Sequence, residues 1–227
     1  MAKDSTGLNE ILNKEDVHVN NQITFKLPDR LIAKKYLFRT IYNRGKGYAF
    51  TVDPDFMHVS TSIKYWDNIG EQFYSKYYGI NKKHLEWGAD VVEGLPIVGP
   101  FGRFWPIDMT INYKGEVAIP WSVLTNLPVQ GTGHDIVSIA RVSFFSRLKK
   151  TGLYDKGVKL ISTVHDSIVA DIPDTLAQPV CNLFHQVFDD IPLNIMKMFN
   201  YDWQVPLGCE VKYGANLKTM TKLDRTA

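Results

Sequence analysis

The sequence contains 227 residues, of which 44% are hydrophobic and 22% charged, and these values exclude a disordered or low-complexity chain. No run approaches the ~18 consecutive apolar residues of a membrane span, the N-terminus lacks a secretory signal, and two cysteines are too few for a disulfide framework. The net charge is +2, but two basic segments, residues 26–46 and 141–159, suit either a polyanionic partner or solvated helix faces. We therefore expect a globular, cytoplasmic protein.

The first half of the chain predicts mainly helices. Residues 1–13 are polar and predict a loose lead segment. Residues 30–42 are rich in helix formers, contain no Gly or Pro, and directly follow Asp29, which is a helix-start signal. Residues 60–87 predict an aromatic-rich helical segment that is interrupted near Gly79.

Short strands and two longer helices are expected after that. The expected strands are residues 104–111, 116–119, 159–164, 168–172 and 205–213. The first two are expected to pair as a hairpin, and so are the next two, around a turn at His165-Asp166-Ser167.

The two later helices complete the predicted order of elements. Residues 126–150 predict the longer one, and residues 179–198 predict the other, with a break near Pro192. The apolar face of the longer helix is expected to contain Ile136, Val137, Ile139, Ala140, Val142 and Phe144. Helices followed by a strand pair, a helix and a strand predict an α+β fold.

One polar and aromatic stripe stands out on the helix predicted at residues 30–42. Arg30, Lys34, Phe38 and Tyr42 recur every four residues, and each step advances about 400° on a helix, so they share one face. The two cations can hold a triphosphate, and the two rings can stack on a base or sugar. On spacing alone, packing with solvated charge is the commoner meaning of such a stripe.

Four segments, in the correct order, resemble family A (Pol I-like) DNA polymerases. The stripe resembles the fingers helix of that family, and His18 precedes it as in the replicative polymerases of short-tailed phages. The segment NLPVQGT at 126–132 resembles the family's Asn-x-Pro-x-Gln-Gly-Thr motif, VHD at 164–166 resembles the palm motif, and 205–211 resembles the last palm strand. The resemblance implies helical fingers and part of a palm with an antiparallel β-hairpin.

The resemblance implies that five residues bind the incoming nucleotide. Arg30, Lys34 and His18 match residues that bind the phosphates of a dNTP, and the first two also assist catalysis. Phe38 stands where the family has Phe or Tyr facing the sugar, and Tyr42 matches the tyrosine that stacks beside the templating position.

The same resemblance implies contacts with primer–template DNA and with metal. Asn126 and Gln130 match amides that contact the minor groove near the insertion site, where base-pair shape is checked without reading sequence. His165 resembles the residue beside the primer terminus. Asp166 resembles one of two aspartates that hold a pair of Mg²⁺ ions, and this is the metal ligand that we expect in the chain.

The family's other metal-binding aspartate, in an Asp-x-Ser-x-x-Glu motif, has no counterpart before Arg30, and thumb and proofreading regions are missing. We therefore expect the carboxy-terminal portion of a split polymerase, whose natural start at Met1 is favoured over an artificial fragment. Its expected parts are a lead segment at 1–25, fingers at 26–112 and palm at 113–227. A partner chain would supply the thumb, the remaining palm and the second aspartate.

Three smaller departures from the family pattern occur at Asn43, Ser122 and Ser167. The last of these replaces a glutamate after the palm aspartate and removes a carboxylate that the predicted site does not need. The turn after the fingers helix and one primer–template contact are expected to differ at the other two positions.

Two other functions are compatible with parts of the sequence. A phage-type single-subunit RNA polymerase shares the Arg-x3-Lys spacing, the helix-end tyrosine and the His-Asp-Ser turn, but Phe38 and residues 126–132 favour DNA synthesis. A non-catalytic DNA-binding or scaffold protein derived from a polymerase would not need Arg30, Lys34 and Asp166, and all three are present.

Overall fold

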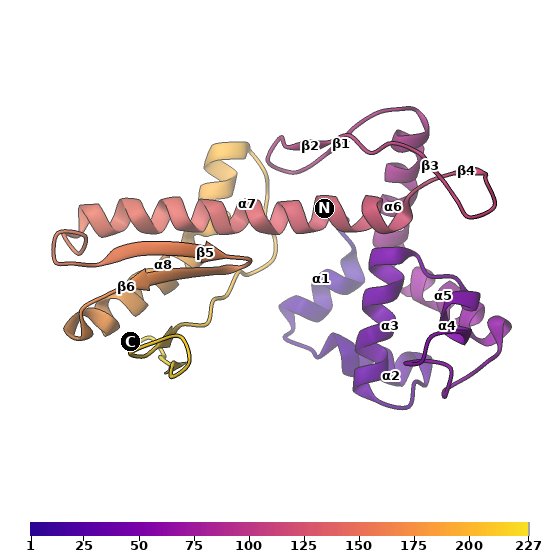
Figure 1. The fold of residues 1–227 in the computed structure, drawn as a ribbon, viewed down its shortest axis with the longest axis horizontal. Coiled ribbons are helices and arrows are strands. Elements are labelled where there is room, and N and C mark those ends of the chain that lie inside the picture. Colours follow the sequence, from indigo (N-terminus) through magenta and orange to yellow (C-terminus); the bar gives the residue numbers. More distant parts are fainter. Residues whose placement is uncertain (227) are drawn as a thin grey trace. The chain divides into compact units, whose positions relative to one another are not determined.

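The computed structural model describes residues 1–226 and contains two compact units, Met1–Gln130 and Gly131–Ala227. Helix α7 (Trp121–Lys150) begins in the first unit and ends in the second. Helices dominate, and the strands form small antiparallel hairpins, so the predicted α+β class is confirmed (Figure 1). Among the described residues, no helix is long and apolar enough to cross a membrane.

Most of the first unit is helical. Its helices before α7 are α1 (Ser5–Leu12), α2 (Val17–Phe25), α3 (Arg30–Asn43), α4 (Gly47–Thr51), α5 (Ile63–Lys76) and α6 (Tyr78–Val92) (Figure 1). They enclose an aromatic core in which the Tyr36 and Trp66 rings stack with centroids 5.8 Å apart, and the Phe50 ring lies 5.1 Å from that of Trp66. Aromatic rings therefore supply much of the packing in this unit.

Helix α3 confirms the helix predicted at residues 30–42. Asp29 caps its N-terminus, because the carboxylate accepts a hydrogen bond of 2.8 Å from the Ile32 amide. Arg44 ends the helix in the left-handed conformation, with a φ of 45°. The buried face of the helix consists of Ile32, Ala33, Tyr36, Leu37 and Thr40.

The N-terminal residues are ordered as α1, so the prediction of a loose lead at residues 1–13 is wrong. Asp4 accepts hydrogen bonds from the Gly7 amide of α1 and from the Gly79 amide of α6, at 2.8 and 2.7 Å. Glu10 is buried and forms an ion pair of 2.8 Å with Lys76. The polar residues that predicted a loose segment instead form hydrogen bonds and an ion pair with distant helices.

Two short hairpins follow α6. In the first, β1 (Ile97–Val98) pairs with β2 (Phe104–Trp105), and in the second, β3 (Thr110–Ile111) pairs with β4 (Val117–Ala118). The predicted pairing of residues 104–111 with 116–119 is therefore correct only for its end nearest the turn. Pro106 follows β2 and lacks the N–H group that a longer ladder would need.

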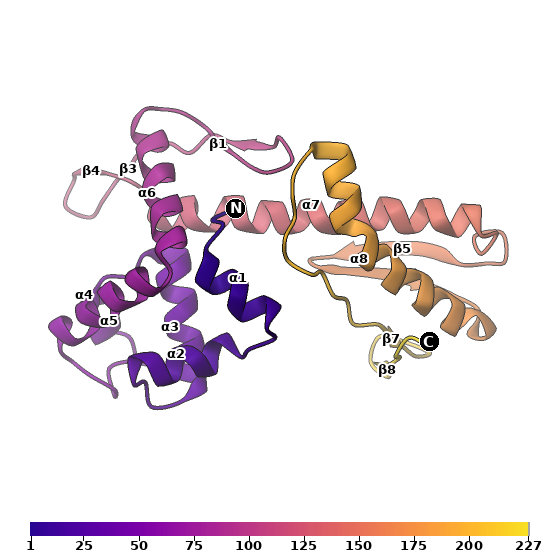
Figure 2. The same cartoon turned by 180° about the vertical axis from the view of Figure 1, so that it is seen from behind.

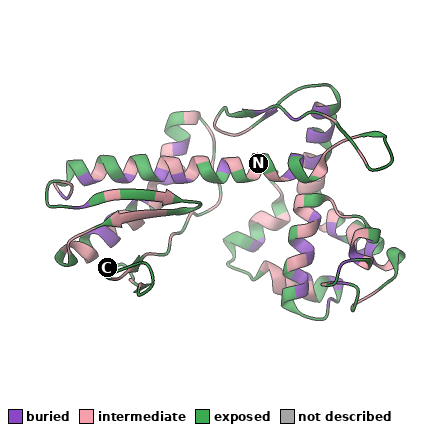
Figure 3. Ribbon diagram, viewed as in Figure 1, coloured by how far each residue is buried: buried purple, intermediate pink, exposed green. Residues whose placement is uncertain are grey.

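The second unit contains the strand pair predicted around His165. Strands β5 (Lys159–Val164) and β6 (Ser167–Asp171) are antiparallel, with Val164 opposite Ser167, so His165 and Asp166 form the turn. Ser167 belongs to β6, and the strand ends one residue earlier than predicted. Neither strand contains a fully buried residue, as Figure 3 shows by the green and pink of this hairpin.

Helix α7 includes the predicted helix at 126–150 but begins five residues earlier and continues through Pro128. Its buried hydrophobic residues in the second unit are Val137, Ala140, Phe144 and Leu148. Val142 is 64% exposed, so its predicted place on the apolar face is wrong. Residues on the same helix face as Val137 follow it in steps of three or four positions, and position 142 is not reached by such steps.

The remaining elements are η1 (Asp174–Leu176), α8 (Ala177–Phe199), β7 (Lys212–Tyr213) and β8 (Thr221–Lys222). Figure 2 labels the last three of them, seen from behind. Helix α8 packs on α7 through an edge-to-face contact of Phe144 and Phe184, with centroids 5.0 Å apart. It is continuous through Pro192, so the predicted break is wrong, and the buried Ile191 and Ile195 lie on either side of the proline.

The strand predicted at residues 205–213 is also wrong over most of its length. Only its last two residues are in a strand, β7, and they pair with β8 in the register Lys212↔Lys222. Residues 205–211 do not form a strand because, within the described residues, no strand pairs with them. Strand β8 pairs with β7 alone and ends after two residues.

Candidate nucleotide and nucleic-acid site

The exposed face of α3 displays the predicted stripe. Arg30, Lys34 and Phe38 are exposed and Tyr42 is half-buried, whereas the opposite face of the helix enters the aromatic core. The Phe38 and Tyr42 rings are stacked with an interplanar angle of 10° and centroids 5.8 Å apart. Lys34 Nζ lies 5.8 Å from the centroid of the Phe38 ring. Two cations and a stacked pair of rings therefore share one surface.

Helix α2 brings His18 to the same surface. The centroids of the His18 and Phe38 rings are 6.1 Å apart, although the residues are twenty positions apart in the sequence. Burial is the main cause that lowers the pKa of His18, and the positive charges of Arg30 and Lys34 lower it further, against the opposing effect of Asp16. At neutral pH the imidazole is therefore uncharged. Its Nδ1 is buried and has no hydrogen-bond partner among residues 1–226.

Arg30 is held by a carboxylate. Its Nε donates to Asp16 Oδ2 at 2.8 Å, and this ion pair joins the first residue of α3 to the residue that caps α2. The hydrogen bond from Arg30 holds the pKa of Asp16 below its usual range. The two side chains are 53% and 42% exposed, so the pair lies at the surface and the guanidinium remains accessible.

The Tyr42 end of α3 is fixed by two residues that sequence reasoning did not identify. Thr125 of α7 is fully buried, and its hydroxyl donates to the Tyr42 carbonyl at 2.6 Å. The Arg44 guanidinium lies between the rings of Tyr74 and Trp121, at 4.8 and 4.7 Å from their centroids. Neither contact can be predicted from a local sequence pattern. The Thr125 hydrogen bond, for example, joins residues 83 positions apart.

Asn126 and Gln130 occupy one face of α7, one helical turn apart, within the first unit. Gln130 is exposed. The Oδ1 atom of Asn126 is buried and has no hydrogen-bond partner in the part of the chain that the structure describes. Since Asn126 directly follows Thr125, this amide is next to the residue that holds the Tyr42 carbonyl.

His165 and Asp166 form the tip of the β5–β6 hairpin, in the second unit, and both are exposed. His165 has a φ of 52°, which few residues other than Gly, Asn, Asp and His adopt. Carboxylate oxygens suit Mg²⁺, which takes one or two carboxylates from the protein, so Asp166 fits one position of such a site. The described residues contain no group of three acidic, His or Cys side chains that could hold a metal ion.

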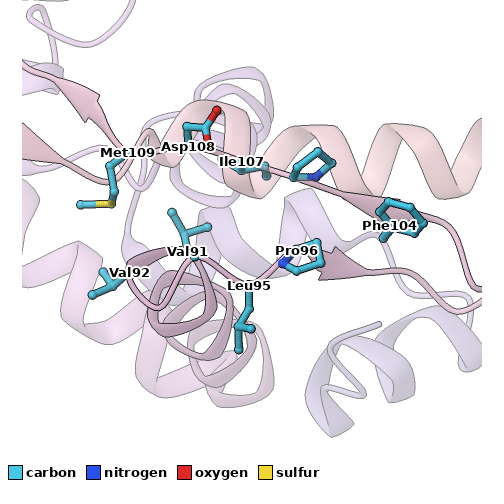
Figure 4. Close-up of a pocket in the computed structure, with 10 residues that line it drawn as sticks. Val91, Val92, Leu95, Pro96, Phe104, Ile107, Asp108 and Met109 are labelled. Carbon is cyan, nitrogen blue, oxygen red and sulfur yellow. The ribbon is translucent and has the colours of Figure 1, made fainter.

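A separate hollow of about 400 Å³ lies between the end of α6 and the β1–β4 segment (Figure 4). Its lining is apolar apart from Asp108, and the side chains of Val91, Leu95, Phe104 and Met109 border it. None of the predicted site residues lines this hollow. In the first unit, the structure brings together His18 and the α3 stripe, and Thr125 and Asn126 follow at its Tyr42 end.

Comparison with known proteins gives one family. A family model described as DNA polymerase family A matches residues 1–219. DNA polymerase I of Aquifex aeolicus is 28% identical over 202 residues, which cover 85% of this chain and 32% of the relative. The thermostable DNA polymerase I of Thermus filiformis is 35% identical over 83 residues, 34% of this chain and 9% of the relative.

Two further similarities concern a phage protein and a solved structure. The DNA polymerase of Bacillus phage SP01 is 23% identical over 197 residues, 82% of this chain and 20% of the relative. The POL domain of Pol1 from M. smegmatis, in complex with DNA primer-template and dNTP, has a TM-score of 0.72 at 16% identity, over 91% of this chain and 35% of that one. The fold is thus shared, and the chain spans about a third or less of the length of these proteins.

Proposed function

This chain belongs to DNA polymerase family A, and from that membership we propose that it takes part in template-directed DNA synthesis, the transfer of dNMP to a primer 3′-hydroxyl. The observation that carries the proposal is the surface of α3, where two cations, a stacked ring pair and an uncharged histidine lie together. The family resemblance is confirmed, whereas the phage type and the two-chain arrangement stay predictions.

We propose that Arg30, Lys34 and His18 bind the triphosphate of the incoming dNTP. The planar guanidinium can bind phosphate oxygens in pairs, and the ammonium adds a mobile point charge. Positive charge at this position stabilises the negative charge that develops on the leaving pyrophosphate.

The aromatic pair suits the nucleoside part of the substrate. Phe38 is 43% exposed, so its outer surface is available to a sugar. The Tyr42 ring stacks on the Phe38 ring and holds it in place. In our proposal Tyr42 also stacks beside the templating position, where the flat face of any base can be accepted.

Three further residues are assigned to primer–template DNA in this proposal. Asn126 and Gln130 carry amides that can donate to the acceptors common to all base pairs in the minor groove. His165, at the exposed hairpin tip, would lie beside the primer terminus.

Asp166 is proposed to hold Mg²⁺ with a carboxylate that lies outside these 227 residues. A pair of Mg²⁺ ions, when bound, stabilises the charge on the attacking and leaving oxygens. What the chain itself contributes is an exposed carboxylate at a two-residue turn, with backbone geometry set by the β5–β6 register.

We propose that a partner chain supplies that second carboxylate, in an Asp-x-Ser-x-x-Glu motif, together with the thumb and the rest of the palm. The exposed hairpin supports this, because Ile161 is 65% and Val164 50% exposed on strands without a buried residue. A two-stranded hairpin is only marginally stable by itself, and further strands beside it would bury these side chains. In the same proposal, residues 26–112 form the fingers and residues 113–227 form the palm portion.

Primer extension by the affinity-purified chain together with its co-purified proteins tests the function. The proposal expects incorporation of dNTPs, identification by mass spectrometry of a partner with the missing motif, and near inactivity of the chain alone. Preferential incorporation of rNTPs would favour the phage-type RNA polymerase instead. DNA binding without synthesis by the complete assembly would favour the scaffold function.

A further inference from the structure

We propose that Asp16 is a positioning residue of the nucleotide site, which orients Arg30 toward the triphosphate and fixes the start of the helix that carries His18. The inference rests on the proposed function, because it assigns the way in which the phosphate-binding side chains are held. It concerns a carboxylate that does not itself contact the nucleotide.

The two oxygens of Asp16 have separate partners. Oδ1 accepts hydrogen bonds from the His18 and Val19 amides at 3.0 and 3.2 Å, which caps the N-terminus of α2. Oδ2 accepts from Arg30 Nε at 2.8 Å. One carboxylate therefore links the helix that carries His18 to the helix that carries Arg30 and Lys34.

The geometry of the Arg30 contact leaves the useful part of the guanidinium available. Asp16 engages the Nε edge, and within the described residues no hydrogen bond is recorded for the two terminal nitrogens of Arg30. With the Nε edge occupied, the two terminal nitrogens can still form paired hydrogen bonds with a phosphate. Because one N–H is held, fewer rotamers remain to be lost when the nucleotide binds.

Charge gives Asp16 a second effect. His18 faces two cations, Arg30 and Lys34, and Asp16 is the acidic group that opposes them there. The carboxylate thus reduces the repulsion between Arg30 and Lys34, the two cations that must gather beside the uncharged His18 around a single triphosphate. Without it, Arg30 would be freer to turn into solvent, away from His18 and Lys34.

Asp16→Asn separates the two functions of the carboxylate. The remaining carbonyl oxygen can still cap α2, but an NH₂ group would replace Oδ2 and face Arg30 Nε, donor against donor. Asp29→Asn is a matched control, because Asp29 caps the next helix through Ile32 and no ion pair to it is recorded among the described residues. Both variants remove one negative charge near Arg30.

The first measurement is proton exchange with water at the Arg30 Nε–H, followed by NMR on the full chain and assigned by its loss in Arg30→Lys. The positioning role predicts slow exchange in the wild type and in Asp29→Asn, and faster exchange in Asp16→Asn. The amide signals of His18 and Val19 should persist in Asp16→Asn, because the cap is kept. Equal Nε–H exchange in wild type and Asp16→Asn would overturn the proposal.

The second measurement is the binding of dATP with Mg²⁺ to the full chain in complex with its co-purified partner and primer–template. Asp16→Asn should weaken dATP binding about two- to fivefold, the range expected for an exposed ion pair, whereas Asp29→Asn should not. In an Arg30→Ala background, Asp16→Asn should have no further effect. Equal weakening by both Asn variants, or a persistent effect without Arg30, would contradict the positioning role.

The two measurements also distinguish this inference from the proposed function. If the Arg30 Nε–H responds to Asp16→Asn but the wild-type assembly does not bind dATP, the nucleotide site itself is refuted and the inference falls with it. If dATP binds equally to wild type and Asp16→Asn, the nucleotide site stands and only the positioning role is refuted.

Discussion

Phe38 shows how a single side chain can combine exposure with order. Its ring is 43% exposed, yet it contacts Tyr42 by stacking, Lys34 through a cation–π contact, and His18 at 6.1 Å. These contacts fix the plane of the ring while its outer surface stays free. In our proposal this exposed surface of the ring faces the sugar of the nucleotide.

Substituting Phe38 by Tyr should increase chain termination by dideoxynucleotides. The phenol adds a hydrogen-bonding group where the dideoxy sugar lacks one, and the stack on Tyr42 is kept, so the folded chain should be unaffected. The measurement is the ratio of termination to extension in primer extension by the partner-bound enzyme. Phe38→Leu, which removes the stack without adding a hydroxyl, is the control and should not raise this ratio. Equal sensitivity of wild type and Phe38→Tyr would argue against the assigned place of Phe38.

Single residues also show which parts of the site the sequence could predict. The spacing of Arg30, Lys34 and Phe38 was sufficient to predict that they share a surface, because residues four positions apart lie on the same face of a helix. The contacts of Thr125 and Arg44 could not be predicted, because a hydroxyl–carbonyl bond and a cation between two rings depend on tertiary packing. Both hold the end of α3 that carries Tyr42.

Among the elements, α1 is docked by buried polar contacts. Glu10 accepts a hydrogen bond of 2.7 Å from the Tyr77 hydroxyl and pairs with Lys76, and Lys76 also donates to Asn21 of α2 at 2.8 Å. Burial, helped by Glu10, raises the pKa of Tyr77, so its hydroxyl stays protonated as a donor. The network joins α1, α2 and α5, and it supports the helix that brings His18 to the site.

Glu10→Gln should lower the free energy of unfolding by about 2–3 kcal/mol, because it leaves the largely buried ammonium of Lys76 without its counter-charge. Urea unfolding followed by tryptophan fluorescence measures this. Glu15→Gln is the control: Glu15 accepts from Asn20 at 2.7 Å in an exposed position, and its change should stay within about 0.5 kcal/mol. A Glu10 variant as stable as the Glu15 variant would show that the network does not hold α1.

Helix α6 should make the chain sensitive to acid through His84. Burial is the main cause that lowers the pKa of this histidine to about 4, and the charge of Arg44 adds to it. The unfolded state therefore binds a proton more readily than the folded state, so stability is complete above pH ~6.5 and falls as the pH drops toward ~4, by about 3 kcal/mol in all.

The difference in unfolding free energy between wild type and His84→Asn, measured in urea from pH 7 to pH 4.5, isolates this effect from the carboxylates. Asparagine carries no proton, so the variant should lose less stability than the wild type across this range. Parallel pH profiles for the two proteins would contradict the assigned pKa shift.

The predicted elements differ from the observed ones where local pattern and tertiary contact disagree. Helix α3 and the β5–β6 hairpin were predicted correctly, because each is specified by its own period and turn. Helix α1 was missed because its polar residues bind distant helices, and the strand at 205–213 failed because only its end has a strand partner. Helix α8 passes through Pro192 because its buried residues continue on both sides.

At the scale of the whole molecule, our proposal assigns two parts of a polymerase to the two units of the chain. The proposed phosphate-binding surface belongs to Met1–Gln130, and the hairpin with Asp166 belongs to Gly131–Ala227. In our account they act on one nucleotide, and a partner provides the second carboxylate. The exposed strands beside Asp166 are the surface that we expect this partner to cover.

The rate of single-nucleotide incorporation by the partner-bound chain, compared between wild type and Asp166→Asn, tests this central claim most directly. We expect the substitution to reduce the rate by at least about a hundredfold, because loss of a direct metal ligand should cost no less than the roughly 10- to 100-fold that loss of an outer-shell partner costs. Asp155→Asn, an exposed aspartate of the same unit, should leave the rate unchanged. Undiminished synthesis by Asp166→Asn would contradict the account, because this aspartate would then not be needed for the chemistry.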